Sequence, residues 1–383
     1  MSRVSVKPQL FRWARERAGL DAAALIEHFP KYAAWESGEA QPTLRQLESL
    51  AKKTLTPFGY FFLQEPPEEK LPIPDFRTLG DRAPARPSPN LLETIHTMQR
   101  RQDWMRDDLL EAGADPLPFV GTATLRSDPL DAARRIRETL RMLDGWAREH
   151  SSWTAALLAL RRATEATGIL VVINGVVGNN TTRKLDPEEF RGFVLCDRHA
   201  PLIFINGADF KSAQMFTLAH ELAHVWLGRD GVFNLPDLQP GSSEVERFCN
   251  RVAAEVLIPS RELEECWPEV AHAPEPFQKL AARFKVSPMV AARRALDAGM
   301  VTLAEFRAFL RAYQDDERRK ASAKKSGGGD FYATQDVRVG KRFGDAVVRA
   351  ARAGRLLYRD AYRLTGLHGQ TFDRFAQGLE AGV

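Results

Sequence analysis

The spacing of apolar residues changes along the chain, and the change divides it into regions. Up to residue 63, and again over residues 90–112 and 129–167, apolar positions recur every three or four residues, which predicts amphipathic helices. Three later segments are short, rich in β-branched and aromatic residues and separated by turn residues, which predicts strands. These segments are Ile169–Ile173, Phe190–Leu195 and Leu202–Ile205. We therefore expect a small, mostly antiparallel sheet that follows a helical region.

Helical spacing returns after the predicted sheet. Two helices are expected at about 211–227 and 243–257, and Pro259 ends the second. Residues 275–312 predict three more short helices, and residues 331–383 predict a small helical unit. The predicted fold class is therefore α+β, with the strands confined to one part of the chain.

Two segments break the apolar pattern and are expected to be linkers. Residues 66–89 contain seven prolines, and residues 313–330 are basic and end in a run of glycines. The expected organisation is an all-α domain at 1–65, a Pro-rich linker at 66–89, a domain at 90–312 with its core at about 165–300, a basic Gly-rich linker at 313–330, and a helical region at 331–383.

Composition narrows the class of protein. The chain has 383 residues, a net charge of +4 and only three cysteines, which are not arranged as CxxC pairs. The cysteines are Cys196, Cys249 and Cys266. We find no apolar run of about 18 residues and no apolar signal core at the N-terminus, so we expect no membrane association and a cytoplasmic protein with reduced thiols. The charge is compatible with nucleic-acid binding but is too small to argue for it.

The sequence HELAH at residues 220–224 contains two histidines four residues apart. On a helix this spacing places His220 and His224 on one face, one turn apart, as two ligands of one tetrahedral zinc ion require. Glu221 lies about 100° further round the helix, where it can reach a zinc-bound water without being a ligand. Because zinc lowers the pKa of that water to about 7, Glu221 can accept its proton as a general base. The motif predicts a hydrolytic Zn²⁺ centre.

A catalytic zinc also needs a third protein ligand and an open fourth position. The next predicted helix contains Glu246 and Glu255, whose nine-residue separation places them on opposite faces, so both cannot bind one metal. Glu246 is the preferred ligand because it shares a face with Asn250, which is a candidate to orient a ligand by a hydrogen bond. Glu255 is the second choice. Cys249 is a third conceivable ligand, but it is interpreted as a buried structural thiol.

A peptide substrate would also need a surface on which to lie. If the strand at Phe190–Leu195 forms a sheet edge, an extended substrate can pair with it. If that strand is paired on both sides, it offers no such edge. The sequence leaves both alternatives open.

Four segments resemble the ImmA/IrrE family of zinc metallopeptidases: EFRGFVLCD, PLIFIN, FTLAHELAHVWLG and EVERFCNRVAAEVLIP, in this order. The resemblance covers roughly residues 165–300 and implies a gluzincin-like domain. It implies that His220, His224 and Glu246 bind zinc and that Glu221 is the base. The family commonly has Ala-Asn where this chain has Cys249-Asn250. The resemblance also implies regulated cleavage of a repressor-type DNA-binding protein.

The segment from Arg12 to Lys53 resembles a helix-turn-helix domain of the Xre/Cro type, and WESGEAQPTLRQLE carries most of that resemblance. It implies DNA binding through a recognition helix near Pro30–Ser37. The candidate DNA contacts are Lys31, Tyr32, Ser37, Thr43 and Arg45. Residues 1–65 hold nine Lys/Arg and seven Asp/Glu, so their excess of positive charge is small for a surface that binds phosphate groups. The alternative is therefore a dimerisation or partner-binding module. Residues 276–300 show a similar pattern of helix, turn and helix. They are interpreted as a structural packing unit in preference to a second DNA-binding element.

Two functional classes follow. The first is a regulatory zinc endopeptidase whose protein substrate is a repressor-type or toxin partner and whose helix-turn-helix domain binds DNA. The second is a transcriptional regulator or antitoxin in which the metal site is structural or sensory. Glu221 favours the enzyme, because a structural zinc site needs no general base beside it.

Overall fold

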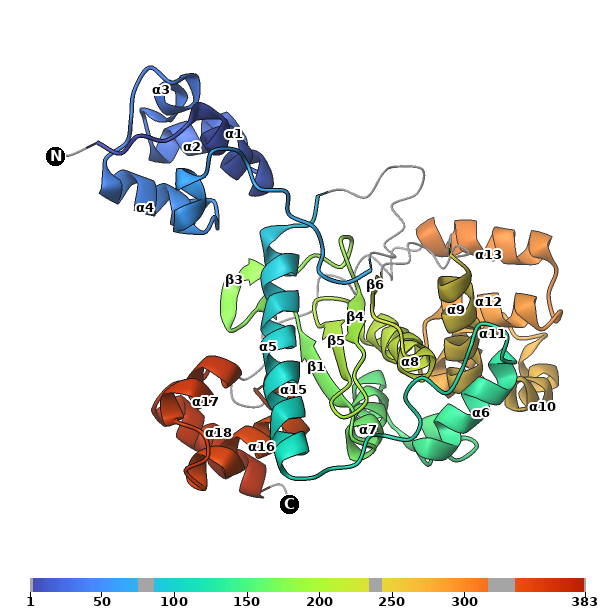
Figure 1. Ribbon diagram of the computed structural model, residues 1–383. Helices are drawn as coiled ribbons and strands as arrows, with labels where there is room; N and C mark the ends of the chain where they lie inside the picture. Colours follow the sequence, from blue (N-terminus) through green and yellow to red (C-terminus); the bar gives the residue numbers. More distant parts are fainter. Residues whose placement is uncertain (1–2, 75–85, 234–242, 316–334, 382–383) are drawn as a thin grey trace. The chain divides into compact units, whose positions relative to one another are not determined.

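The computed structural model describes residues 3–74, 86–233, 243–315 and 335–381 (Figure 1). The described residues form two compact units. The first comprises residues 3–72 together with 86–95, and the second comprises Ile73 and Pro74 together with the described residues from His96 onward. The secondary structure is mainly helical with a small sheet, which confirms the mixed α+β class.

The first unit is a set of short helices whose starts are set by side-chain caps. Asp21 accepts a hydrogen bond from Ala24 N at the start of the second helix, as its position before an apolar segment predicts. Thr43 and Gln46 form a reciprocal capping box at the start of the fourth. The elements are α1 (Pro8–Arg17), α2 (Ala22–His28), α3 (Tyr32–Ser37), α4 (Leu44–Lys53) and the 3₁₀ helix η1 (Phe58–Phe62).

Aromatic side chains form the core of this unit. Phe11, Tyr32 and Trp35 are fully or almost fully buried, and the Trp35 ring lies 6.1 Å from the Phe11 ring and 6.4 Å from the Tyr32 ring. The Tyr32 hydroxyl donates a 2.9 Å hydrogen bond to the Phe11 carbonyl oxygen. Helix α3 is therefore held against α1 by large buried rings as well as by its short connections.

The second unit is built around a four-stranded sheet in the order β1-β5-β4-β6. Its strands are β1 (Leu170–Asn174), β4 (Gly192–Leu195), β5 (Leu202–Asn206) and β6 (Gly231–Phe233), and a separate hairpin contains β2 (Val176–Val177) and β3 (Asn180–Lys184). Strand β1 pairs with β5 in parallel, whereas β5–β4 and β4–β6 are antiparallel. The mostly antiparallel prediction holds for two of these three pairings, and β2, β3 and β6 were not predicted.

Both faces of the sheet are buried, which explains why its strands read as continuous apolar runs. Val171, Val194 and Ile203 belong to the same core cluster as the apolar residues of helix α8 (Lys211–Leu227). On helix α5 (Pro89–Glu111), Gln102 donates hydrogen bonds to the carbonyl oxygens of Leu195 and Ala200 at 2.7 and 3.0 Å. The sheet therefore lies between helical layers.

The remaining helices complete the layers of the second unit. The predicted helical stretch 129–167 is interrupted, because Gly145 adopts a positive φ of 74° and a 3₁₀ turn follows it. The helices not yet named are α6 (Pro129–Thr139), η2 (Trp146–Glu149), α7 (Trp153–Ala166), α9 (Glu244–Leu257), α10 (Ser260–Val270), α11 (Pro276–Phe284), α12 (Pro288–Asp297), α13 (Leu303–Asp315), α15 (Gln335–Val339), α16 (Lys341–Arg352), α17 (Tyr358–Thr365) and α18 (Gln370–Ala381). The segment 276–300 contributes Phe277, Leu280 and Ala291 to the core cluster that contains α8, in agreement with its interpretation as a packing unit.

The C-terminal helices pack against the rest of the second unit through a buried arginine. Arg101 donates hydrogen bonds to the carbonyl oxygens of Leu364, Arg338 and Thr365 at 2.9, 3.2 and 3.3 Å. These carbonyls lie at or near helix ends, where a helix leaves its last acceptors unsatisfied. Burial lowers the pKa of Arg101 to about 10, and its guanidinium joins the C-terminal helices to α5.

Parts of both predicted linkers lie outside the described residues, namely 75–85 of the Pro-rich segment and 316–330 of the basic segment. Among the helices that the structure describes, none is both long and apolar enough to cross a lipid bilayer.

Gly192 is required by the close approach of β4 to α8. A Cβ atom at this position would lie 2.6 Å from Thr217 Cγ2 and 2.9 Å from the Phe204 carbonyl oxygen. We expect Gly192→Ala to lower the free energy of unfolding by about 1–3 kcal/mol through overpacking, measured by denaturant unfolding. The matched control is Gly378→Ala, because no atom lies within 4 Å of the added Cβ there. Equal stability of the two variants would contradict this account.

Candidate metal centre

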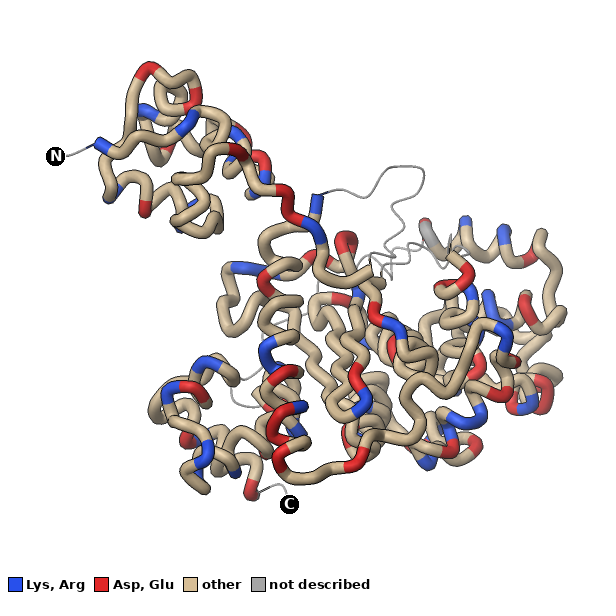
Figure 2. Tube along the Cα trace, viewed as in Figure 1, with Lys and Arg blue, Asp and Glu red and all other residues tan. Residues whose placement is uncertain are grey.

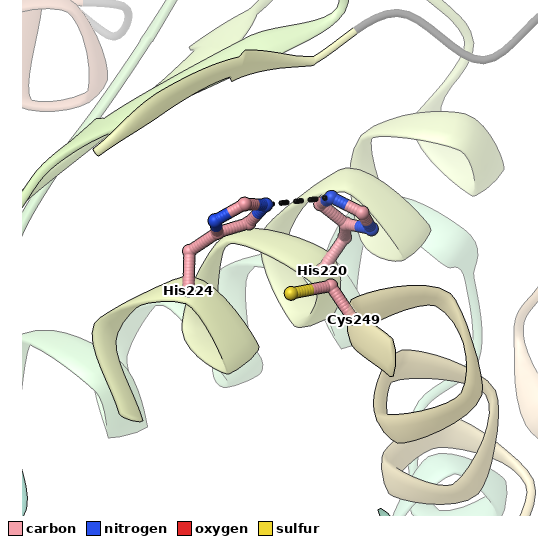
Figure 3. A group of neighbouring side chains, drawn as sticks. All are labelled: His220, His224 and Cys249. Atoms are coloured by element: carbon pink, nitrogen blue, oxygen red, sulfur yellow. Dashed lines mark hydrogen bonds between the residues drawn. The ribbon is translucent and has the colours of Figure 1, made fainter. Parts of the chain in front are cut away.

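Helix α8 carries the two histidines of the HELAH motif on one face. His220 and His224 are 0% and 1% exposed, and their Nε2 atoms lie 3.2 Å apart (Figure 3). The helix is buried on all sides from Gln214 to Leu227, and it ends at Gly228, whose positive φ of 64° provides a left-handed cap. Its last carbonyls are also covered, because Gly121 N and Ala123 N donate to Val225 O and Trp226 O. This burial gives both imidazoles a fixed position.

Helix α9 brings a carboxylate to the same point. The Ser243 hydroxyl accepts a hydrogen bond from Glu246 N, which sets where the helix begins and so where Glu246 projects. Glu246 Oε2 lies 3.2 Å from His220 Nε2, and Oε1 lies 3.2 Å from His224 Nε2. The structure thus brings together the three side chains that the sequence proposed as ligands.

Glu255, the second choice for a ligand, lies elsewhere, and that alternative was wrong. Its carboxylate accepts hydrogen bonds from Ser260 N and from the Ser260 hydroxyl at 3.0 and 2.8 Å. It also pairs with Arg294. Because Glu255 is nine residues from Glu246, it projects from the other side of α9 and ties that helix to α12 instead.

The spacing of these atoms matches a metal-binding set. Ligand atoms at 2.0–2.1 Å from a tetrahedral zinc ion are separated from one another by about 3.3 Å. The Nε2 atoms of His220 and His224 lie 3.2 Å apart, and each lies 3.2 Å from a different carboxylate oxygen of Glu246. The side chains therefore already enclose a space of the size that such an ion requires.

Asn250 orients one of the imidazoles. Its Oδ1 atom lies 3.0 Å from His220 Nδ1, so that Nδ1 carries the ring proton and donates it to the amide oxygen. The lone pair of His220 Nε2 then points towards His224 and Glu246. Asn250 is one helical turn beyond Glu246, which is why one helix supplies both contacts.

Burial and charge set the protonation states. Burial lowers the pKa of His220, which favours the neutral imidazole that a metal ligand must be. Burial alone would raise the pKa of Glu246, but the adjacent imidazoles of His220 and His224 outweigh it and lower that pKa to about 2. These shifts favour a neutral imidazole at His220 and an ionised carboxylate at Glu246.

Glu221 is the most unusual group of the site. It is 0% exposed, and among the described residues neither of its carboxylate oxygens has a hydrogen-bond partner. Burial, reinforced by the charge of Glu246, raises the pKa of Glu221 well above its usual value. Leaving such a group unpaired is costly, so a site of this kind points to a bound cation or water. An added Cβ at Gly192 would lie 3.1 Å from Glu221 Oε1, so the absence of a side chain there leaves room for the carboxylate.

Two further residues lie at the site: Cys249, for which the sequence interpretation preferred a structural role, and Phe233, which it did not assign to the site. Cys249, interpreted as a structural thiol, offers its Sγ within 4.8 Å of a ligand nitrogen of both His220 and His224, and all three residues are buried (Figure 3). Its helical spacing of three from Glu246 was the available signal. Burial raises the pKa of Cys249 well above its usual value. Phe233 of β6 stacks on His220, with ring centroids 3.8 Å apart, and only the tertiary structure reveals that contact.

Strand β4 is not a sheet edge. Gly192, Phe193 and Val194 pair with β5 on one side and with β6 on the other. The edge next to the histidines belongs to β6, where Val232 N donates a 3.1 Å hydrogen bond to Pro74 O. The proposal that a substrate pairs with the strand at Phe190–Leu195 is therefore corrected, because its backbone groups are already used.

The five candidate DNA contacts of the first unit differ in exposure. Tyr32 is fully buried and bonded to Phe11 O, so its assignment as a DNA contact was wrong: the ring forms the core that fixes α3. Thr43 is half-buried and its hydroxyl caps α4. Lys31, Ser37 and Arg45 are exposed and remain available.

Comparison with known families gives two matches. Residues 164–296 match the IrrE N-terminal-like domain (Peptidase_M78), a range that includes the sheet, α8 and α9. Residues 339–378 match a domain of unknown function (DUF8813) that covers α16 and α17. No curated protein matches the chain at a significant level. The first match indicates a metallopeptidase-type domain of the ImmA/IrrE kind, and such a domain implies a bound metal.

The metal content should depend on the residues that converge at α8 and α9. We expect roughly one metal ion per chain in the purified protein, and loss of most of it in His220→Ala, His224→Ala and Glu246→Ala, because each substitution removes one of the side chains that converge on the ion. Elemental analysis of the folded proteins measures this. Glu244→Ala is the matched control, since Glu244 lies on the same helix but is exposed. Full metal content in Glu246→Ala would assign the third ligand elsewhere.

Proposed function

We propose that the chain is a regulatory zinc-dependent endopeptidase. The observation that carries this proposal is the convergence of His220, His224 and Glu246 at mutual distances of 3.2 Å, with the unpaired carboxylate of Glu221 buried on the same helix. A structural metal site would not need that carboxylate, whereas hydrolysis does. The metallopeptidase-type match of residues 164–296 supports the same conclusion.

In this proposal the two imidazoles and Glu246 are the zinc ligands, and Asn250 holds His220 in the tautomer that binds. When bound, zinc supplies Lewis-acid chemistry and lowers the pKa of water to about 7. Glu221 accepts a proton from the attacking water and delivers it to the leaving amine of the peptide. Burial raises the pKa of Glu221, and a raised pKa makes its carboxylate a better proton acceptor than an ordinary exposed carboxylate.

The first unit is proposed to be a helix-turn-helix domain of the Xre/Cro type that brings the peptidase to DNA or to its substrate. Support comes from the sequence resemblance and from a compact set of short helices with Lys31, Ser37 and Arg45 exposed. By the same resemblance, the substrate is proposed to be a repressor-type DNA-binding protein or a toxin partner. These assignments rest on chemistry weaker than that of the metal centre, because the basic surface is small.

The second candidate is a transcriptional regulator or antitoxin whose metal site is structural or sensory. The position of Cys249 favours it, since a thiol within 4.8 Å of both histidines offers a possible fourth protein ligand. Structural zinc sites are closed by four protein ligands, whereas catalytic sites keep one position open. The role of Glu221 separates the two candidates.

Glu221→Gln keeps the shape of the side chain but removes its basicity. We expect it to bind zinc as the wild type does and to cleave its protein substrate about 10²–10⁴-fold more slowly, because the general base is lost. The measurement is incubation of the full-length protein with candidate repressor or toxin partners, with fragments detected by mass spectrometry. Glu244→Gln is the control. Cleavage by Glu221→Gln at the wild-type rate would contradict its role as the base. Full complementation in cells by Glu221→Gln, but not by His220→Ala, would favour the regulator.

DNA binding, if it belongs to the first unit, should depend on its exposed cations. The double substitution Lys31→Glu and Arg45→Glu in the full chain is expected to weaken DNA binding by on the order of tenfold or more. It should also reduce the slope of log affinity against log salt concentration by about two, because two phosphate contacts are lost. Fluorescence anisotropy with upstream DNA at several salt concentrations measures both. Lys52→Glu, an exposed residue near the end of α4, is the control. An unchanged salt slope would move the contact to another surface.

A further inference from the structure

The face of α9 that meets the two histidines carries three polar side chains, not two. Glu246, Cys249 and Asn250 lie at helical spacings of three and four, so all three project towards α8. Glu246 contacts both imidazoles and Asn250 contacts His220, as described above. Cys249 is fully buried, and Figure 3 shows its side chain directed to the space beside His220 and His224. The thiol is therefore part of the centre and not only of the hydrophobic packing.

Thiolate sulfur is a preferred zinc ligand, with a bond of about 2.3 Å. Around one tetrahedral zinc ion, a sulfur and a histidine nitrogen would be separated by about 3.5 Å. Cys249 Sγ already lies within 4.8 Å of a ligand nitrogen of both histidines. The observed and required separations therefore differ by at most about 1.3 Å, which is within the range of a side-chain movement.

The buried carboxylate of Glu221 is the second observation that points to a bound cation at this place. Both of its oxygens are without hydrogen-bond partners among the described residues. Three acidic groups gather here, the carboxyl groups of Glu246 and Glu221 and the Cys249 thiol, and each becomes an anionic partner for a divalent cation when it loses its proton.

We propose that Cys249 is a fourth protein ligand of the metal, and that the centre of the resting protein is closed by His220, His224, Glu246 and the Cys249 thiolate. This inference rests on the proposed zinc centre and adds its regulation. With a metal bound, Cys249 would have released its proton to solvent and would hold the ion through its thiolate. Release of that thiolate, with return of a proton from solvent, would leave the position open to a water molecule beside Glu221. A closed centre has no place for that water, so the peptidase is latent until the sulfur leaves.

Cobalt substitution of the full-length protein tests the ligand directly. Tetrahedral cobalt has visible d–d bands, and a thiolate ligand adds a sulfur-to-cobalt charge-transfer band in the near ultraviolet. We expect this band in the wild type and its loss in Cys249→Ala, with the d–d bands retained and the apparent metal affinity lowered about 10- to 100-fold. Cys196→Ser is the matched control, because Cys196 Sγ is the other nearby thiol, 3.6 Å from the His224 carbonyl oxygen, and it should keep the band.

Whether Cys249 closes the fourth metal position is tested with acetohydroxamate, a small metal-binding probe that needs an open coordination position. We expect it to shift the d–d bands of cobalt Cys249→Ala but not those of the cobalt wild type. Cobalt bound without the charge-transfer band overturns the Cys249 assignment alone and leaves the zinc endopeptidase proposal in place. An equal hydroxamate shift in both proteins overturns the latency. If the wild type binds no cobalt, the proposed metal centre fails as well.

Discussion

The arrangement of the second unit depends on one constraint, which is the burial of four ionisable side chains between α8 and α9. His220, Glu221, His224 and Glu246 are all 2% exposed or less. Removing an unpaired polar group from water costs about 2–7 kcal/mol, and removing a charge costs more. Such a cluster persists only if its members satisfy one another or share a cation, and the 3.2 Å separations show the first condition partly met. Glu221 satisfies this condition least, because neither of its carboxylate oxygens has a hydrogen-bond partner among the described residues.

The surrounding elements can be understood from the need to hold that cluster in place. Helix α8 is buried on all sides, so its side chains have one arrangement, and its C-terminal carbonyls are covered by Gly121 and Ala123. Strand β4 approaches α8 closely because residue 192 is glycine. Phe233 of β6 packs on His220 from the sheet side, and α9 starts where the Ser243 cap places Glu246. Each of these contacts removes freedom from a ligand, which is what preorganises a metal site.

In the first unit the large side chains and the charged groups serve mainly the packing of the unit itself. Its largest aromatic side chains are buried in its own core. Glu36 on α3 forms ion pairs with Arg12 and Arg15 of α1. These pairs neutralise cations that a nucleic-acid surface would otherwise use. Helix α3 has six residues and no lysine of its own, and Lys31 lies immediately before it, so this helix offers few cations to a phosphate backbone.

The sequence by itself determined the local features: the helix with His220 and His224 on one face, the cap at Asp21, the capped helix Leu44–Lys53 and three of the strands. These depend on residues a few positions apart, so their periodicity is visible in the chain. Tertiary structure decided the rest. It paired β1 in parallel with β5, placed β4 inside the sheet, chose Glu246 over Glu255, buried Tyr32 and brought Cys249 to the histidines. Those outcomes depend on how distant segments pack, and no local pattern of apolar and polar residues encodes that packing.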